Sequence, residues 1–139
     1  MGLEWRYLND HRGVMATASG HLSGAEFVGA VWRVNAFAAK TKPICYTYFD
    51  FNGVTSISLS TLDLARAAEC AIAAADAQET ERIVSVVASE EAAYRLATIY
   101  TVFIERTGWE VRTFRDRDDA VAWLRTRAET KHGITVEVA

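Results

Sequence analysis

Residues 44–62 combine a buried strand, a turn and a helix start, and this unit most constrains the fold. Residues 44–51 (ICYTYFDF) are β-branched or aromatic on both faces, which is typical of a strand buried on both sides. Asn52 and Gly53 predict a turn, because both tolerate positive φ. Ser60 then predicts a helix N-cap. The loop between them lies beyond the carboxyl end of a buried strand, where α/β folds usually place functional groups.

The rest of the chain alternates between strand and helix patterns. Leu3–Leu8 and Val14–Ser19 predict an antiparallel pair of strands around a polar turn. Ile83–Ala88 and Trp109–Phe114 predict two further strands. The predicted helices begin after N-caps at Ser23, Ser60, Ser89 and Asp116. The pattern predicts an α/β fold with a mixed, mostly parallel sheet of about five strands and four helices.

Length and charge restrict the class of protein. A chain of 139 residues supports one domain, so we assign residues 1–139 to it, with 128–139 as a C-terminal extension. A net charge of −3 gives no general attraction to nucleic acid or to anionic membranes. We see no signal peptide and no apolar run that would span a membrane, and expect a cytoplasmic protein. Cys45 and Cys70 are typical of small buried side chains that stay reduced.

The C-terminal extension carries one more strand pattern. Ile134–Val138 alternates apolar and polar residues after a glycine. Such a strand would add to the edge of the sheet or pair with a second copy of the chain. We therefore expect a homodimer formed through this segment or through an exposed helix.

Residues 50–62 (DFNGVTSISLSTL) resemble the signature loop of STAS domains, the fold of the anti-sigma factor antagonist SpoIIAA. Ser60 falls at the serine that is phosphorylated in the sporulation antagonists. Ser58 stands where that family has an acidic residue, and Thr61 where it has glycine. Residues 92–97, 114–116 and 120–124 are more similar to the SpoIIAA-like, or STAS-like, bacterial family. The likeness covers about residues 3–125.

The resemblance implies a non-enzymatic regulatory or protein-interaction module that is switched at Ser60 and has a protein partner. A phosphate on this residue would meet the free N–H groups at the start of a helix and would change how a partner docks. Ser60 acting only as an N-cap remains the simpler interpretation. The expected docking loop contains Asp50, Asn52, Gly53, Ser58 and Thr61.

No pattern of catalytic residues is visible. The sequence contains no nucleophile elbow, Walker motif or dinucleotide-binding fingerprint. His11, His21 and His132 share no metal-ligand spacing with either cysteine. We therefore expect no enzyme activity, no cofactor and no metal site.

Aromatic residues support a different hypothesis, a carrier or sensor of a small apolar, lipid-like ligand. Such a ligand would lie between the helices and the sheet, with tyrosine hydroxyls as polar contacts. The candidate pocket residues are Trp32, Tyr46, Tyr48, Tyr94 and Tyr100. The alternative is that these side chains belong to a solid core. The two interpretations differ in whether the aromatic side chains enclose a cavity.

Overall fold

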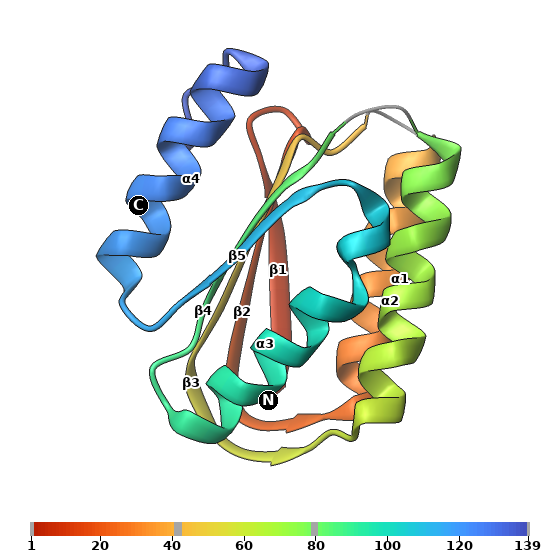
Figure 1. Ribbon diagram of the computed structural model, residues 1–139, viewed down its shortest axis with the longest axis vertical. Helices are drawn as coiled ribbons and strands as arrows, with labels where there is room; N and C mark the ends of the chain where they lie inside the picture. The colour runs from red at the N-terminus through yellow and green to blue at the C-terminus, as the bar shows by residue number, and fades with distance from the viewer. Residues whose placement is uncertain (1, 41–42, 79–80, 139) are drawn as a thin grey trace.

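Five strands form one sheet, in the same order as they occur in the chain. The computed structural model describes residues 2–40, 43–78 and 81–138 (Figure 1). The elements are β1 (Leu3–Leu8), β2 (Gly13–Ser23), α1 (Gly24–Lys40), β3 (Tyr46–Ser58), α2 (Thr61–Ala77), β4 (Ile83–Val87), α3 (Glu91–Phe103), the 3-10 turn η1 (Glu105–Thr107), β5 (Glu110–Phe114) and α4 (Arg117–His132).

The order of the strands determines where the helices lie. β1 pairs with β2 in antiparallel fashion, and every other pair of neighbouring strands is parallel. Right-handed crossovers between successive neighbouring strands place their helices on the same side of a sheet. Accordingly α1, α2 and α3 cover one face, and α4, which follows the edge strand β5, covers the other (Figure 1). The predicted α/β fold, a mixed and mostly parallel five-stranded sheet with four helices, is confirmed.

Alternation along the strands divides the core between the two faces. On β3, Tyr46 and Tyr48 are fully buried beneath α4, whereas Phe49 faces α1 and α3. Ser85 of β4 also points toward α4, where its hydroxyl donates to the carbonyl of Ala120 at 3.0 Å. Because successive side chains of a strand point to opposite faces, neighbouring aromatic residues belong to different cores.

The predicted turn at Asn52 and Gly53 is wrong, because β3 continues to Ser58 and stays paired with a longer β2. Gly53 is needed for close approach rather than for positive φ, since a Cβ there would lie 2.9 Å from the carbonyl oxygen of Ala18. The positive φ of 65° belongs to Gly20 on β2. The predicted loop is therefore a two-stranded ribbon that runs beyond the end of β4.

The third helix also begins differently from the prediction. Its N-cap is Glu90, whose side chain accepts from the backbone N–H of Ala93, and not Ser89. Ser89 instead donates from its backbone N–H and its hydroxyl to Oδ1 of Asn52, at 2.9 and 3.0 Å. Ser89, which the local sequence favours as the cap, therefore bonds instead to a residue far away in the chain.

The C-terminal segment is extended, but the predicted strand at Ile134–Val138 is not formed. Its apolar side chains Ile134, Val136 and Val138 are buried with the Tyr46 and Tyr48 cluster beneath α4. The turn between β1 and β2 fixes the segment, since Asn9 donates from Nδ2 to the carbonyl of Thr135 at 2.8 Å. The segment therefore packs its apolar side chains into the core of its own chain.

Candidate functional site

Ser60 forms a complete capping box at the start of α2. Its hydroxyl oxygen accepts from the backbone N–H of Asp63 at 3.2 Å, and its own backbone N–H donates to Oδ2 of Asp63 at 3.0 Å. The hydroxyl also donates to that oxygen at 3.1 Å. These bonds hold the pKa of the Asp63 carboxyl below its usual value, and the bond from the Ser60 backbone has the largest effect. The predicted cap is confirmed, and Ser60 is an exposed residue.

The starts of α1 and α2 lie next to each other. A Cβ on Gly24, the first residue of α1, would lie 2.0 Å from Oδ2 of Asp63, so any larger residue would displace this carboxylate. Ser23 and Glu26 form a second capping box, in which the Ser23 hydroxyl accepts from the Glu26 backbone N–H at 3.1 Å. Two helix N-termini, each with a partial positive charge, therefore flank Ser60.

The ribbon that leads into Ser60 carries a polar surface. His21 of β2 bridges two serine hydroxyls of β3, with Nδ1 at 2.7 Å from Ser56 and Nε2 at 2.8 Å from Ser58. All three side chains are exposed. A histidine held on both sides by hydroxyl groups has a structural function in fixing the ribbon, and the sequence alone did not indicate this contact.

Two of the expected docking residues have internal roles. Asp50 accepts from the backbone N–H of Asn52 at 2.9 Å and lies 3.7 Å from the guanidinium of Arg117. Asn52 accepts both hydrogen bonds from Ser89 and so holds the loop before α3. Asp50 and Asn52 therefore stabilise neighbouring loops, whereas Ser58 and Thr61 are exposed beside Ser60. Gly53 is also exposed, further back on the ribbon.

An apolar side chain, which the sequence analysis missed, lies beside Ser60. Leu62 is 58% exposed, and we call the surface formed by Ser58, Ser60, Thr61 and Leu62 the Ser60 face. An open groove of about 540 Å³ between α1 and α2 runs from Asp63 to Trp32. Trp32 is 60% exposed. An exposed leucine at the first turn of a helix gives no periodic signal, so only the structure reveals it.

The five candidate aromatic residues do not line one pocket. Tyr46 and Tyr48 are buried beneath α4, while Tyr94 and Tyr100 belong to the core on the opposite face, and Trp32 faces outward. Burial raises the pKa of Tyr46 and of Tyr48 to about 12, so both hydroxyls stay protonated. The expected single pocket is therefore not formed by these residues.

A small apolar cavity does exist beneath α3. Tyr100 and Phe27 line it with their rings 5.2 Å apart and nearly perpendicular, together with Leu22 and Phe51. Its volume is about 30 Å³. A wall of this composition offers almost no hydrogen bonds, and apolar cavities of this kind stay dry.

Within residues 2–40, 43–78 and 81–138, no three side chains among histidine, cysteine, aspartate and glutamate come together as metal ligands would. In the same ranges, no helix has both the length and the apolar character needed to cross a bilayer.

No protein-family model matches the chain, and no curated protein does. The solved structures that are similar to it include the following two. One is an uncharacterised protein of the DUF3478 family with a SpoIIAA-like fold, from Shewanella loihica PV-4, with 19% identity, a TM-score of 0.55, and coverage of 88% of this chain and 94% of that chain. The other is the anti-sigma factor antagonist SpoIIAA in its unphosphorylated form, with 11% identity, a TM-score of 0.50, and coverage of 89% and 98%. The chain has a SpoIIAA-like fold.

Proposed function

We propose that this chain is a non-enzymatic regulatory module that binds a protein partner through the Ser60 face. One observation carries the proposal: Leu62 is exposed directly beside the capping serine, and the next residue, Asp63, lines an open groove that also includes the exposed Trp32. Large exposed apolar side chains rimmed by polar groups are characteristic of protein-binding surfaces. The SpoIIAA-like fold of the chain is compatible with this function.

The chemistry around Ser60 favours binding over catalysis. A nucleophilic serine needs a base that removes its proton, whereas the Ser60 hydroxyl donates to the Asp63 carboxylate, a weak base because hydrogen bonds from Ser60 lower its pKa. The nearest histidine on the ribbon, His21, bonds to Ser56 and Ser58 instead. Ser60 is therefore arranged as an exposed cap that a modifying enzyme can reach.

We further propose that phosphorylation of Ser60 controls docking. A phosphate on this hydroxyl would lie beside the Asp63 carboxylate that now accepts its proton, and the two negative charges would repel each other. The capping box would open, and the surface beside Leu62 would become strongly acidic. A partner that packs on Leu62 would then have to bury that charge, which is costly.

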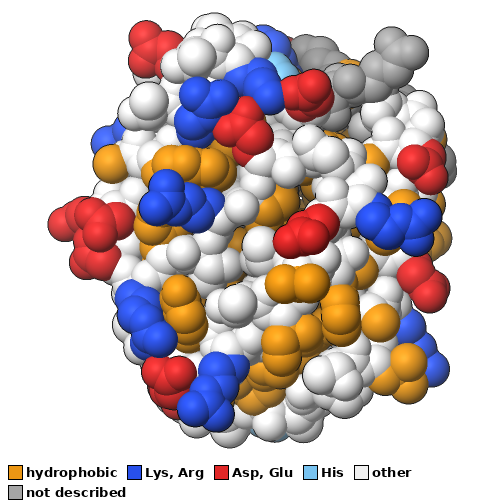
Figure 2. Space-filling view, in the orientation of Figure 1, with side chains coloured by type: hydrophobic (Ala, Val, Ile, Leu, Met, Phe, Trp, Pro, Cys, Tyr) orange, Lys and Arg blue, Asp and Glu red, His pale blue; other side chains and the backbone are white. Residues whose placement is uncertain are grey.

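The surface is tested by photo-crosslinking in the native cells, with a photoreactive residue at position 62 or, as a control, at 102. Val102 is 56% exposed, close to the 58% of Leu62, but lies on α3, over which Figure 2 shows other hydrophobic side chains. We expect one discrete partner to be captured from position 62 and not from 102. Equal capture from both positions would contradict the proposed surface.

The switch is tested with two variants that retain the cap. Asparagine and aspartate are as good as serine at an N-cap, so Ser60→Asn and Ser60→Asp differ mainly in charge. We expect Ser60→Asn to bind the captured partner as the wild type does, and Ser60→Asp to bind it at least about tenfold more weakly, which is about 1.4 kcal/mol. Equal affinities in a titration of the purified pair would exclude control by charge at Ser60.

The cavity beneath α3 is the observation that favours the second candidate function, a carrier of a small apolar ligand. Its volume of about 30 Å³ admits only a few heavy atoms. A lipid-like ligand would therefore require α3 to move outward and expose Tyr100. Intact mass measured under native conditions distinguishes the two functions, because a carrier purified from its own cells retains its ligand.

A further inference from the structure

Three buried polar atoms without hydrogen-bond partners line one cavity beneath α1. They are Oδ1 of Asn35 on α1, Oγ1 of Thr47 on β3 and Nε of Arg82, the residue before β4. The three side chains are 9%, 4% and 4% exposed. Buried polar groups are almost always hydrogen-bonded to protein or to ordered water, so three such residues around one cavity require a partner that the described residues do not supply.

Arg82 brings an uncompensated positive charge into this cavity. In the part of the chain that the structure describes, no carboxylate forms an ion pair with it; the guanidinium instead stacks on the ring of Trp109 at 4.1 Å. Burial lowers the pKa of Arg82 to about 10, so the group is still charged at neutral pH. A buried cation without a counter-charge is costly, and an anion in the cavity would remove that cost.

Asn35 requires that the ligand also donate a hydrogen bond. Its Nδ2 donates to the carbonyl of Val31 at 2.9 Å, which fixes the amide so that Oδ1 is the atom without a partner. A bare anion would place its negative charge against this oxygen. Arg82 offers only donors, Thr47 offers a hydroxyl that can donate or accept, and Asn35 offers only an acceptor.

We propose that this cavity binds a small monovalent oxyanion that carries one hydroxyl group, of the hydrogencarbonate class. Its charged oxygens accept from Arg82 and Thr47, and its hydroxyl donates to Oδ1 of Asn35. The cavity volume of about 30 Å³ is at least twice the roughly 10–15 Å³ that one enclosed water requires, which limits the ligand to a few heavy atoms. The site is separate from the Ser60 face and does not depend on its function.

Thermal unfolding of the full chain tests the site, with hydrogencarbonate replacing chloride at constant ionic strength and mildly alkaline pH. Nitrate is the matched probe, because it is a planar anion of the same size without a hydroxyl. We expect hydrogencarbonate to raise Tm by roughly 5 °C at ten times its dissociation constant. Nitrate, which leaves Asn35 unsatisfied, should give less than about a third of that shift.

Three variants locate the effect. Arg82→Met removes the charge at similar volume and should abolish the shift. Thr47→Val is isosteric and serves as the second test if Arg82→Met does not fold. It should weaken the apparent affinity for hydrogencarbonate about fivefold, the size of one lost hydrogen bond. Tyr48→Phe is the control: its hydroxyl is also buried without a partner, but it lies on the opposite face of the sheet, so the shift should be unchanged.

Each remaining result would overturn the proposal. The absence of any hydrogencarbonate effect on the wild type would mean that water alone fills the cavity. Equal shifts with nitrate and hydrogencarbonate would show that the ligand's hydroxyl has no role. A shift that persists in both Arg82→Met and Thr47→Val, or is lost in Tyr48→Phe, would place the anion elsewhere.

Discussion

Two glycines of α1 differ in their surroundings, and this difference tests the junction between α1 and α2. A Cβ on Gly24 would displace the Asp63 carboxylate that caps α2, whereas a Cβ on Gly29 meets no atom within 4 Å. We expect Gly24→Ala to lower the free energy of unfolding by about 1 kcal/mol, the typical value of a lost N-cap. Gly29→Ala, the matched control, should raise it by roughly 0.5–1 kcal/mol, because alanine favours a helix. Urea unfolding measures both.

The essential result is that the two substitutions change the free energy of unfolding in opposite directions. If Gly24→Ala also stabilised the protein, Asp63 would have to move without loss, and the capping box would contribute nothing. The Ser60 hydroxyl would then lose its structural role, and the proposed effect of phosphorylation on the box would lose its basis.

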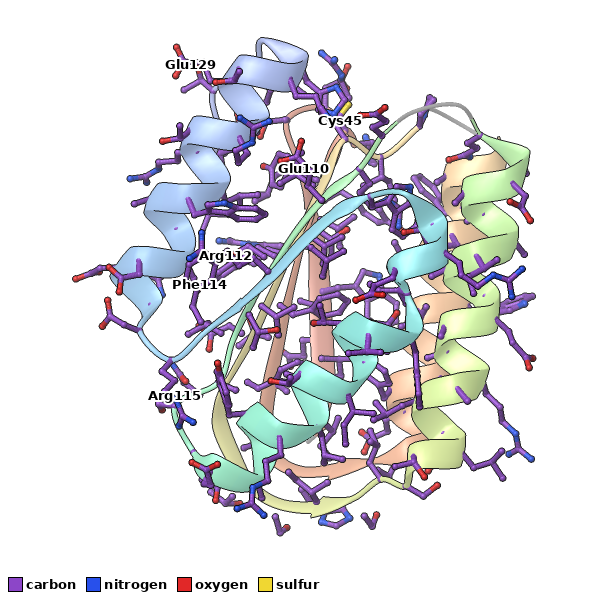
Figure 3. The ribbon with its side chains drawn as sticks, in the orientation of Figure 1. Cys45, Glu110, Arg112, Phe114, Arg115 and Glu129 are labelled. Carbon is purple, nitrogen blue, oxygen red and sulfur yellow. The ribbon has the colours of Figure 1, made fainter. Side chains whose placement is uncertain are left out.

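At the scale of elements, a charged cluster attaches α4 to the edge strand β5. Glu110 accepts from Arg127 at 2.6 and 2.9 Å and lies 2.7 Å from Nζ of Lys131. Figure 3 shows Glu110, Arg112 and Phe114 on the side of β5 that faces α4. The hydrogen bonds from Arg127, and then those from Lys131, lower the pKa of Glu110 to about 2.

This pKa predicts a pH dependence of stability. Because the pKa of Glu110 is lower in the folded state, the stabilisation is present above about pH 4.5 and is lost as the pH falls toward about 2. We expect Glu110→Gln to be less stable than the wild type by about 2 kcal/mol at neutral pH, allowing for partial solvent exposure. Urea unfolding at successive pH values should show that the difference in stability between Glu110→Gln and the wild type disappears near about pH 2.

Glu129→Gln is the control for this measurement. Glu129 is an exposed glutamate on α4, and Figure 3 shows it pointing away from the sheet. Its substitution should change stability by less than about 0.5 kcal/mol at any pH. A stability difference for Glu110→Gln that does not depend on pH would contradict the assignment to ionisation.

At the scale of the whole molecule, the C-terminal segment covers the core beneath α4. Val136 is 6% exposed and lies among buried side chains, whereas its neighbour Thr135 is exposed. We expect Val136→Ala to lower the free energy of unfolding by about 2 kcal/mol, from about 0.8 kcal/mol per buried carbon lost plus a small cavity. Thr135→Ala, one residue away, should cost less than about 0.5 kcal/mol. Equal costs in urea unfolding would mean that the segment does not pack as described.

Local sequence was sufficient to predict the order of the elements and three of the four helix caps. Ser23, Ser60 and Asp116 cap their helices as predicted because each cap uses a backbone group only three residues away. The buried strand before Ser60 could be predicted for a related reason, since its apolar side chains must be hidden on both faces. These features depend on neighbours in the chain, so local chemistry is sufficient to predict them.

Features that depend on residues far apart in the chain could not be predicted from local sequence. β2 and β3 remain paired past Asn52 because the two strands offer each other backbone hydrogen bonds, and Ser89 gives up its cap for a bond to that asparagine. The same holds for the cavity at Arg82, whose three unsatisfied atoms come from α1, β3 and the start of β4. Their hydrogen-bonding requirements meet only once the sheet and helices have assembled, because no local pattern brings them together.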